Sequence, residues 1–146
     1  MSLFRRRRPA PAEAAVPPRR SLSDELEHLL AERTAVDAAG QVHGRHYTEY
    51  VEVVNALKRA GRLDEAEALL LKLVAATKRE SDRAKWGLPA PWYTQQLAII
   101  YRKQRRHADE VAILEAYLAS VSPRRRSEMA GMAARLAKAR ALAEAD

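Results

Sequence analysis

The chain has 146 residues, a formal net charge of +7 and no cysteine. This length favours one domain with a single core, and the lack of cysteine excludes a disulfide scaffold, a thiolate metal site and cysteine catalysis. Alanine is the most frequent residue and aromatic residues make up only 5%, which favours an all-α fold over a β fold.

Residues 1–20 hold most of the net positive charge, because they contain six arginines and one acidic residue. Four prolines block a helix there and apolar residues are too few to pack, so we expect a disordered Arg/Pro-rich tail over 1–20. No apolar run of secretory or membrane-spanning length occurs in the chain, and the expected location is cytoplasmic.

The tail offers one electrostatic hypothesis, contact with phosphates, on nucleic acid or on anionic lipid. The alternative is a solvated tail without a fixed partner, and membrane contact is not expected from a single aromatic residue beside the arginines. The residues of this hypothesis are Arg5, Arg6, Arg7 and Arg8.

The first helix is predicted over 21–39. Ser21 and Asp24 have the spacing of a capping box, and Gly40 follows as a stop signal. An apolar stripe at helical spacing runs along this helix; it consists of Leu22, Leu26, Leu29, Leu30, Arg33 and Val36. Residues 40–46 then form a connector.

Five further helices are predicted from apolar periodicity and from their start and stop signals. A break at 87–91 and the pair Ser122-Pro123 separate them into two hairpins and a last helix. Their ranges are 47–60, 64–85, 91–105, 108–121 and 123–144.

The two hairpins repeat one pattern. Asp64-Glu65 recurs as Asp109-Glu110 at an offset of 45 residues, while Leu57 recurs as Tyr101 at 44. At the larger offset, a set of apolar residues also recurs: Ala66, Leu69 and Leu73 as Val111, Leu114 and Leu118. Each hairpin leaves an apolar face that a neighbouring hairpin can cover.

The segment 55–66, with its glycine turn, acidic pair and packing alanine, resembles the inter-helix stretch of the tetratricopeptide repeat. The pattern Tyr50-x-x-Val53-Val54-x-x-Leu57 and the pattern Leu97-Ala98-x-x-Tyr101 stand where that family has its packing residues. Two departures accompany the resemblance. Arg105 or Arg106 replaces the second turn glycine with one extra residue nearby, and about ten additional residues fall in 79–91.

The stretches GRHYTEYVE (44–52) and PAPWYTQQLAIIYRK (89–103) resemble a group of small bacterial proteins with this repeat. The resemblance implies a right-handed stack of antiparallel helix hairpins over 21–146. Residues 47–85 and 91–121 would be the two repeats, with the helices 21–39 and 123–144 as caps at the ends of the array.

Catalytic or metal chemistry is not predicted. His43 and His46 have the spacing of two metal ligands but lack a third, and they are more typical of a connector in which one caps the next helix. No catalytic triad or phosphate loop is present, so we expect no catalytic residue, no metal and no cofactor. Trp86 and Trp92 either pack the ends of the helices or line a ligand pocket.

The leading hypothesis is a non-catalytic adaptor for protein–protein interaction. By resemblance, the first helix of each repeat lines a concave face, where the cationic helix ends would attract an acidic peptide or partner helix. The predicted binding residues are Asn55, Lys58, Arg59, Trp92, Ile99, Arg102 and Lys103. The alternatives are a nucleic-acid-associated protein that uses the tail and basic turns, and a structural homo-oligomer that stacks through residues 129–143.

Overall fold

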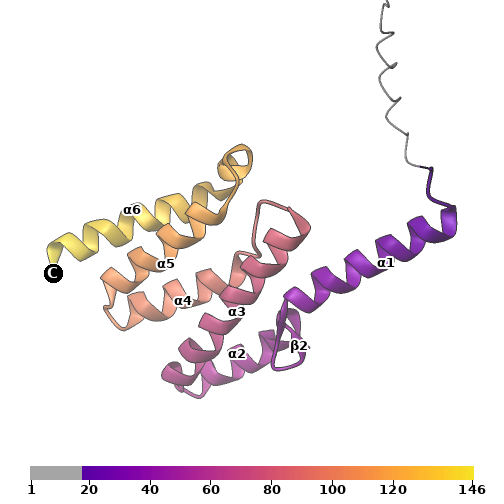
Figure 1. Cartoon of the computed structure of the whole chain (residues 1–146). Coiled ribbons are helices and arrows are strands. Elements are labelled where there is room, and N and C mark those ends of the chain that lie inside the picture. Colours follow the sequence, from indigo (N-terminus) through magenta and orange to yellow (C-terminus); the bar gives the residue numbers. More distant parts are fainter. Residues whose placement is uncertain (1–17) are drawn as a thin grey trace, which may run out of the picture.

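The computed structural model describes residues 18–146 as six helices and one short hairpin (Figure 1). The expected mostly helical fold is therefore confirmed. The disorder predicted for 1–20 falls mainly on residues 1–17, which lie outside the described residues. The helices are α1 (Leu22–Ala39), α2 (Val51–Arg59), α3 (Leu63–Ala84), α4 (Trp92–Lys103), α5 (His107–Ser120) and α6 (Ala130–Ala145).

Short elements join these helices. The predicted connector contains an antiparallel hairpin of β1 (Gln41–Val42) and β2 (Arg45–His46). A 3-10 turn at Tyr47–Tyr50 leads into α2, and a second 3-10 segment at Pro123–Met129 leads into α6. From α2 onward, each helix packs against the next one along the chain. The expected helices 47–60 and 123–144 thus each begin with 3-10 geometry.

The two hairpins, α2–α3 and α4–α5, correspond at an offset of 44 residues. Gly61 and Arg105 occupy the same turn position, and both have positive φ, 71° and 56°. The following amide closes each turn on the preceding helix, from Arg62 to the Leu57 carbonyl at 2.9 Å and from Arg106 to the Tyr101 carbonyl at 2.8 Å. The expected offset of 45 is wrong for α3 and α5, and no extra residue is present in the second turn.

The buried positions follow the same offset. Ala66 corresponds to Glu110, Leu70 to Leu114 and Leu73 to Tyr117, and all six are buried. Under the predicted register, Leu69 and Leu118 would be central core residues, but both are only partly buried. The sequence pattern favours the wrong offset for two reasons. Arg105 stands where the first turn has Gly61, and Glu110 stands where the first hairpin has Ala66.

The additional residues of the first hairpin are mainly two extra turns at the end of α3. The helix α5 ends at Ser120, which corresponds to Ala76, but α3 continues to Ala84. This extension supports the N-terminal elements. Arg79 donates to the backbone carbonyls of Ala39 and Gln41 at 3.1 and 3.2 Å, and Arg83 pairs with Glu32 of α1 at 2.9 Å.

The core has two parts. The first lies between α2, α3 and α4 and is centred on Leu70, Leu73 and Leu97. The second lies between α4, α5 and α6 and is centred on Leu114, Met132 and Leu136. The last helix therefore covers the end of the array, as expected for a cap.

The first helix does not cover the other end. The predicted capping box is present at Ser21 and Asp24, but α1 has no buried residue and extends away from the other helices (Figure 1). Only its last turns pack on α3. The leucines of its stripe are highly exposed: Leu22 80%, Leu26 61%, Leu29 64% and Leu30 62%. The expectation that 21–39 caps the stack is therefore wrong.

Within residues 18–146, no helix combines the length and the apolar character needed to cross a bilayer.

Candidate functional site

A buried carboxylate joins α6 to the second hairpin. Glu110 has no exposed surface, because it stands on the packing side of α5. Arg102 of α4 holds both of its oxygens, at 3.0 and 2.8 Å, and Arg135 of α6 lies 3.0 Å from Oε1. A buried charge is tolerated only with such partners, so Arg102 and Arg135 serve to hold this end of the array together.

The first hairpin has a different arrangement at the same place. Lys58 corresponds to Arg102, but it faces Ala66 instead of a carboxylate, and its ammonium donates a hydrogen bond to Gln96 of α4. Partial burial, and after it the nearby charge of Lys103, lowers the pKa of Lys58 below its ordinary value. Among residues 18–146, no carboxylate forms an ion pair with Lys58 or Lys103. Within the part of the chain that the structure describes, these two cations are therefore uncompensated.

A hollow of about 340 Å³ lies between α4 and α6, and its lining includes Gln96, which accepts the hydrogen bond from Lys58. Its apolar part comes from Ile99, whose surface is 41% exposed, and from Met132. Its full lining is Gln95, Gln96, Ile99, Gly131, Met132 and Arg135. We use the name α2–α4–α6 face for this hollow together with Lys58 and Lys103.

The structure brings together some of the predicted binding residues and separates others. Lys58, Ile99 and Lys103 belong to the α2–α4–α6 face, and Asn55 and Arg59 lie on α2, half-buried and exposed. Arg102 forms an ion pair with Glu110 and is therefore already neutralised. Trp92 packs on the first core and meets the Tyr93 ring edge-on at 5.0 Å, so it does not line the hollow.

The sequence reasoning missed Gln96, Met132 and Arg135. Gln96 lies three residues before Ile99, which is the spacing of neighbours on a helix surface, and this signal could have found it. Met132 and Arg135 come from α6, which was expected to be a cap or an oligomer surface, so no local pattern pointed to them as neighbours of α4.

The two histidines of the connector have different partners. His46 caps the following 3-10 turn by accepting from the Thr48 amide, as expected for one of the two, and its Nε2 contacts the buried carboxylate of Glu80. The Tyr47 hydroxyl also donates to Glu80 at 2.9 Å. His43 instead contacts Lys72. The described residues contain no group of three or more side chains suited to hold a metal ion.

Glycine is required beside this cluster. A Cβ on Gly40 would approach the Glu80 carboxylate to 2.2 Å and the His46 ring to 2.6 Å. A second hollow of about 280 Å³ adjoins these groups at the base of α1, and Trp86 lines it without Trp92. The two tryptophans therefore do not share this hollow, and a ligand pocket lined by both stays a prediction.

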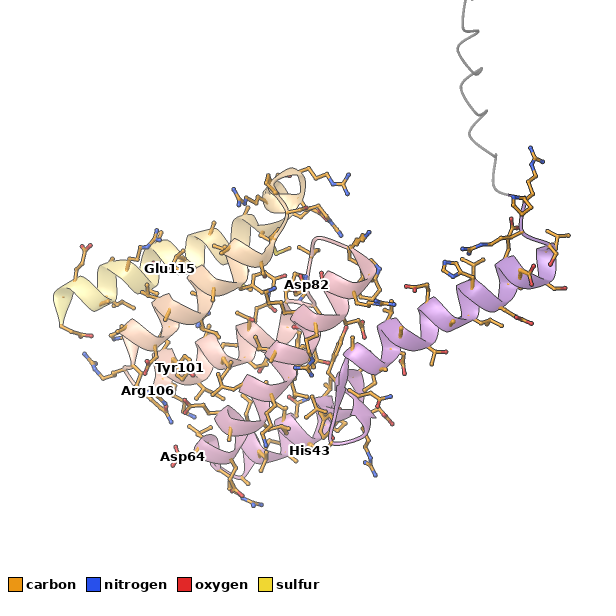
Figure 2. All side chains as sticks on the ribbon, in the orientation of Figure 1. His43, Asp64, Asp82, Tyr101, Arg106 and Glu115 are labelled. Carbon is orange, nitrogen blue, oxygen red and sulfur yellow. The ribbon has the colours of Figure 1, made fainter. Side chains whose placement is uncertain are left out.

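A third polar group links the hairpins to each other. The Arg106 guanidinium lies over the Tyr101 ring, 4.6 Å from its centre, and pairs with Glu67 of α3 at 2.6 Å; Figure 2 shows Tyr101 and Arg106 side by side near the α4–α5 turn. Burial and the hydrogen bond to Glu67 raise the pKa of Tyr101 to about 12. This group connects elements and leaves no free cation.

Comparisons of this chain with family models, with curated proteins and with solved structures give no match.

Proposed function

We propose that the chain is a non-catalytic protein-interaction module that holds an acidic segment with a large apolar side chain on its α2–α4–α6 face. The two hairpins would be repeats of the tetratricopeptide type, and this face would be their concave side. The shared turn geometry at an offset of 44 residues supports that assignment.

The observation that carries the proposal is the uncompensated charge of Lys58 and Lys103. Partial burial already disfavours the charged form of Lys58, so an anionic partner would recover the energy that the free protein loses there. Arg102, by contrast, is neutralised by Glu110. The proposal therefore assigns the binding of the acidic partner to these two lysines. Arg135 also lines the hollow, but it is already paired with Glu110.

Apolar contact would supply the other part of the affinity. Single exposed ion pairs contribute only about 0.2–1 kcal/mol. Ile99 and Met132 both line the hollow, and Ile99 supplies the exposed apolar surface there. A leucine-sized side chain buried there would contribute about 1.5–3 kcal/mol. A segment with both features can reach micromolar affinity, which corresponds to about −8 kcal/mol.

The test uses the full chain and a short synthetic peptide of glutamate and leucine, with a lysine–leucine peptide as its counterpart. Fluorescence anisotropy of the labelled peptides gives the affinity. We expect the acidic peptide to bind at least about tenfold more tightly than the basic one, because complementary charge selects the partner. The double substitution Lys58→Glu with Lys103→Glu should abolish that preference.

The matched control is Arg124→Glu with Arg126→Glu, which changes the net charge equally at two exposed residues of the 3-10 segment before α6. It should keep the preference. Arg102→Glu is unsuitable, since it would place a second carboxylate against Glu110. Equal losses in both double variants would show a general charge effect and contradict this site.

The nucleic-acid alternative uses the basic turns and the tail arginines Arg5, Arg6, Arg7 and Arg8, and these four lie outside the described residues.

A further inference from the structure

The projecting part of α1 carries an acidic and apolar surface that the rest of residues 18–146 leaves uncovered. Residues 22–31 are all exposed. They contain three acidic side chains and no arginine or lysine, and among the eight most exposed large apolar residues of the described chain, four are in this stretch: Leu22, Leu26, Leu29 and Leu30. A contiguous apolar stripe of this kind marks an interaction surface.

Three of these leucines follow a regular helical seam. Leu22, Leu26 and Leu29 are spaced by four and three residues, which aligns them on one side of the helix. The acidic residues Asp24, Glu25 and Glu27 lie among them in the sequence. A segment of α1 therefore has the two properties that the α2–α4–α6 face selects, namely negative charge and large apolar side chains.

We infer that α1 of one copy docks on the α2–α4–α6 face of a second copy. This inference rests on the proposed function, because it names the occupant of the same face. The leucines of α1 would enter the hollow beside Ile99 and Met132, and its carboxylates would neutralise Lys58 and Lys103.

Charge decides between this arrangement and pairing of α1 with α1. Two copies of α1 side by side would bring acidic residues together, since the helix has five carboxylates and one arginine, and like charges disfavour such a pair. Docking on the lysine-bearing face joins opposite charges instead. If two copies exchange their helices reciprocally, the result is a closed dimer with twofold symmetry.

The test is a mixing experiment on full-length variants, with molar mass measured by light scattering after size exclusion. The helix variant carries Leu26→Gln and Leu29→Gln, which keeps helix propensity; the face variant carries Lys58→Glu and Lys103→Glu. We expect the unchanged chain to be a dimer at about 100 μM and each variant alone to be a monomer.

The two variants together should form a heterodimer. The face variant still has an intact α1, and the helix variant still has an intact face, so one of the two contacts is restored on mixing. The control chains Arg124→Glu with Arg126→Glu, and Val53→Gln with Leu71→Gln, should remain dimers. The latter pair changes two exposed apolar residues outside α1.

Three outcomes would overturn the inference. One is an unchanged chain that is monomeric at about 100 μM. Another is a face variant that remains dimeric, which would indicate pairing of α1 with α1. The third is the absence of a heterodimer on mixing. If the chain is monomeric but the glutamate–leucine peptide still binds to the α2–α4–α6 face, only the dimer fails; if the peptide does not bind either, the proposed function fails as well.

Discussion

Each half of the molecule consists of a helical hairpin and a terminal helix, α1 with α2–α3 and α6 with α4–α5, but only α6 is buried against its hairpin. Met132, Leu136 and Ala139 of α6 are in the core, whereas α1 has no buried residue. The halves also differ in charge at an equivalent buried position, which is Ala66 in the first and Glu110 in the second.

These two differences are connected through the cations around that position. Glu110 needs positive partners, and it takes one from its own hairpin, Arg102, and one from the terminal helix, Arg135. Ala66 needs none, so Lys58 remains without a carboxylate among residues 18–146. The comparison teaches that one buried residue determines the role of the neighbouring cation. A buried carboxylate holds the cation in an internal ion pair, whereas a buried alanine leaves it without one.

The largest expected effect comes from making the halves alike with Ala66→Glu. The new carboxylate would be buried with Lys58 as its one cationic neighbour among residues 18–146, because the first half has no arginine equivalent to Arg135. We expect the free energy of unfolding to fall by more than about 4 kcal/mol, measured by chemical denaturation. Ala68→Glu, at an exposed position of the same helix, is the matched control and should change it by less than about 0.5 kcal/mol. A loss below about 1 kcal/mol for Ala66→Glu would show that Lys58 can replace both arginines.

The next effect tests the offset of 44 residues between the hairpins. Leu70 and Leu114 are equivalent and fully buried, so Leu70→Ala and Leu114→Ala should each lower the free energy of unfolding by about 2–5 kcal/mol. Leu69, the partner of Leu114 at an offset of 45, is only partly buried. Leu69→Ala should therefore lower the free energy of unfolding clearly less. A loss equal to that of Leu114→Ala would instead support the offset of 45 residues predicted from the sequence.

The sequence predicted the helices well because their caps, glycines and prolines are local signals. Ser21, Gly40 and Pro123 marked boundaries that the structure confirms within a few residues. The register of the second hairpin could not be predicted, since Arg105 adopts the positive φ usually left to glycine. Local backbone hydrogen bonds from Arg105 to Arg102 and from Arg106 to Tyr101 close this turn, and the residue type at 105 does not reveal it.

The candidate site was only partly predictable for a related reason. Helical spacing placed Lys58, Ile99 and Lys103 on one side of their helices, which is a local property. Whether a cation is neutralised depends on contacts between distant segments, such as Arg102 with Glu110 and Arg135. The exposure of the α1 leucines was also hidden, because an apolar stripe has the same sequence whether its own chain or another molecule covers it.

A moderate effect on the free energy of unfolding is expected from substituting Arg106, which links the two hairpins. Arg106 pairs with Asp109 on its own helix, as Arg62 pairs with Glu65, but it also bonds Glu67 of the first hairpin. Arg106→Gln should lower the free energy of unfolding by about 1 kcal/mol at neutral pH, measured by thermal unfolding. Arg62→Gln, which has only the local pair, should cost less.

The effect of Arg106→Gln should depend on pH. The hydrogen bond from Arg106, aided by that from Tyr101, holds the pKa of Glu67 below its ordinary value. A depressed carboxyl pKa stabilises the fold above the unfolded pKa, and this contribution disappears as pH falls through the folded pKa. The difference between Arg106→Gln and the unchanged chain should therefore shrink below pH about 4. A difference that stays constant down to pH about 2 would assign the effect to the Tyr101 ring contact instead.

The smallest effect is expected at the terminal helix of the first half. Leu26→Ala removes a side chain that is 61% exposed, so at submicromolar protein concentration the free energy of unfolding should stay within about 0.5 kcal/mol. Leu136→Ala, at a buried position of α6, is the counterpart in the second half and should cost about 2–5 kcal/mol. Denaturation repeated at high concentration adds a second comparison, because binding to a second copy stabilises the folded chain by mass action. The unchanged chain should then gain stability with concentration, while Leu26→Ala should gain less. A loss above about 1 kcal/mol for Leu26→Ala at low concentration would show that α1 packs on its own chain. Both terminal helices would then be packed against their own hairpins.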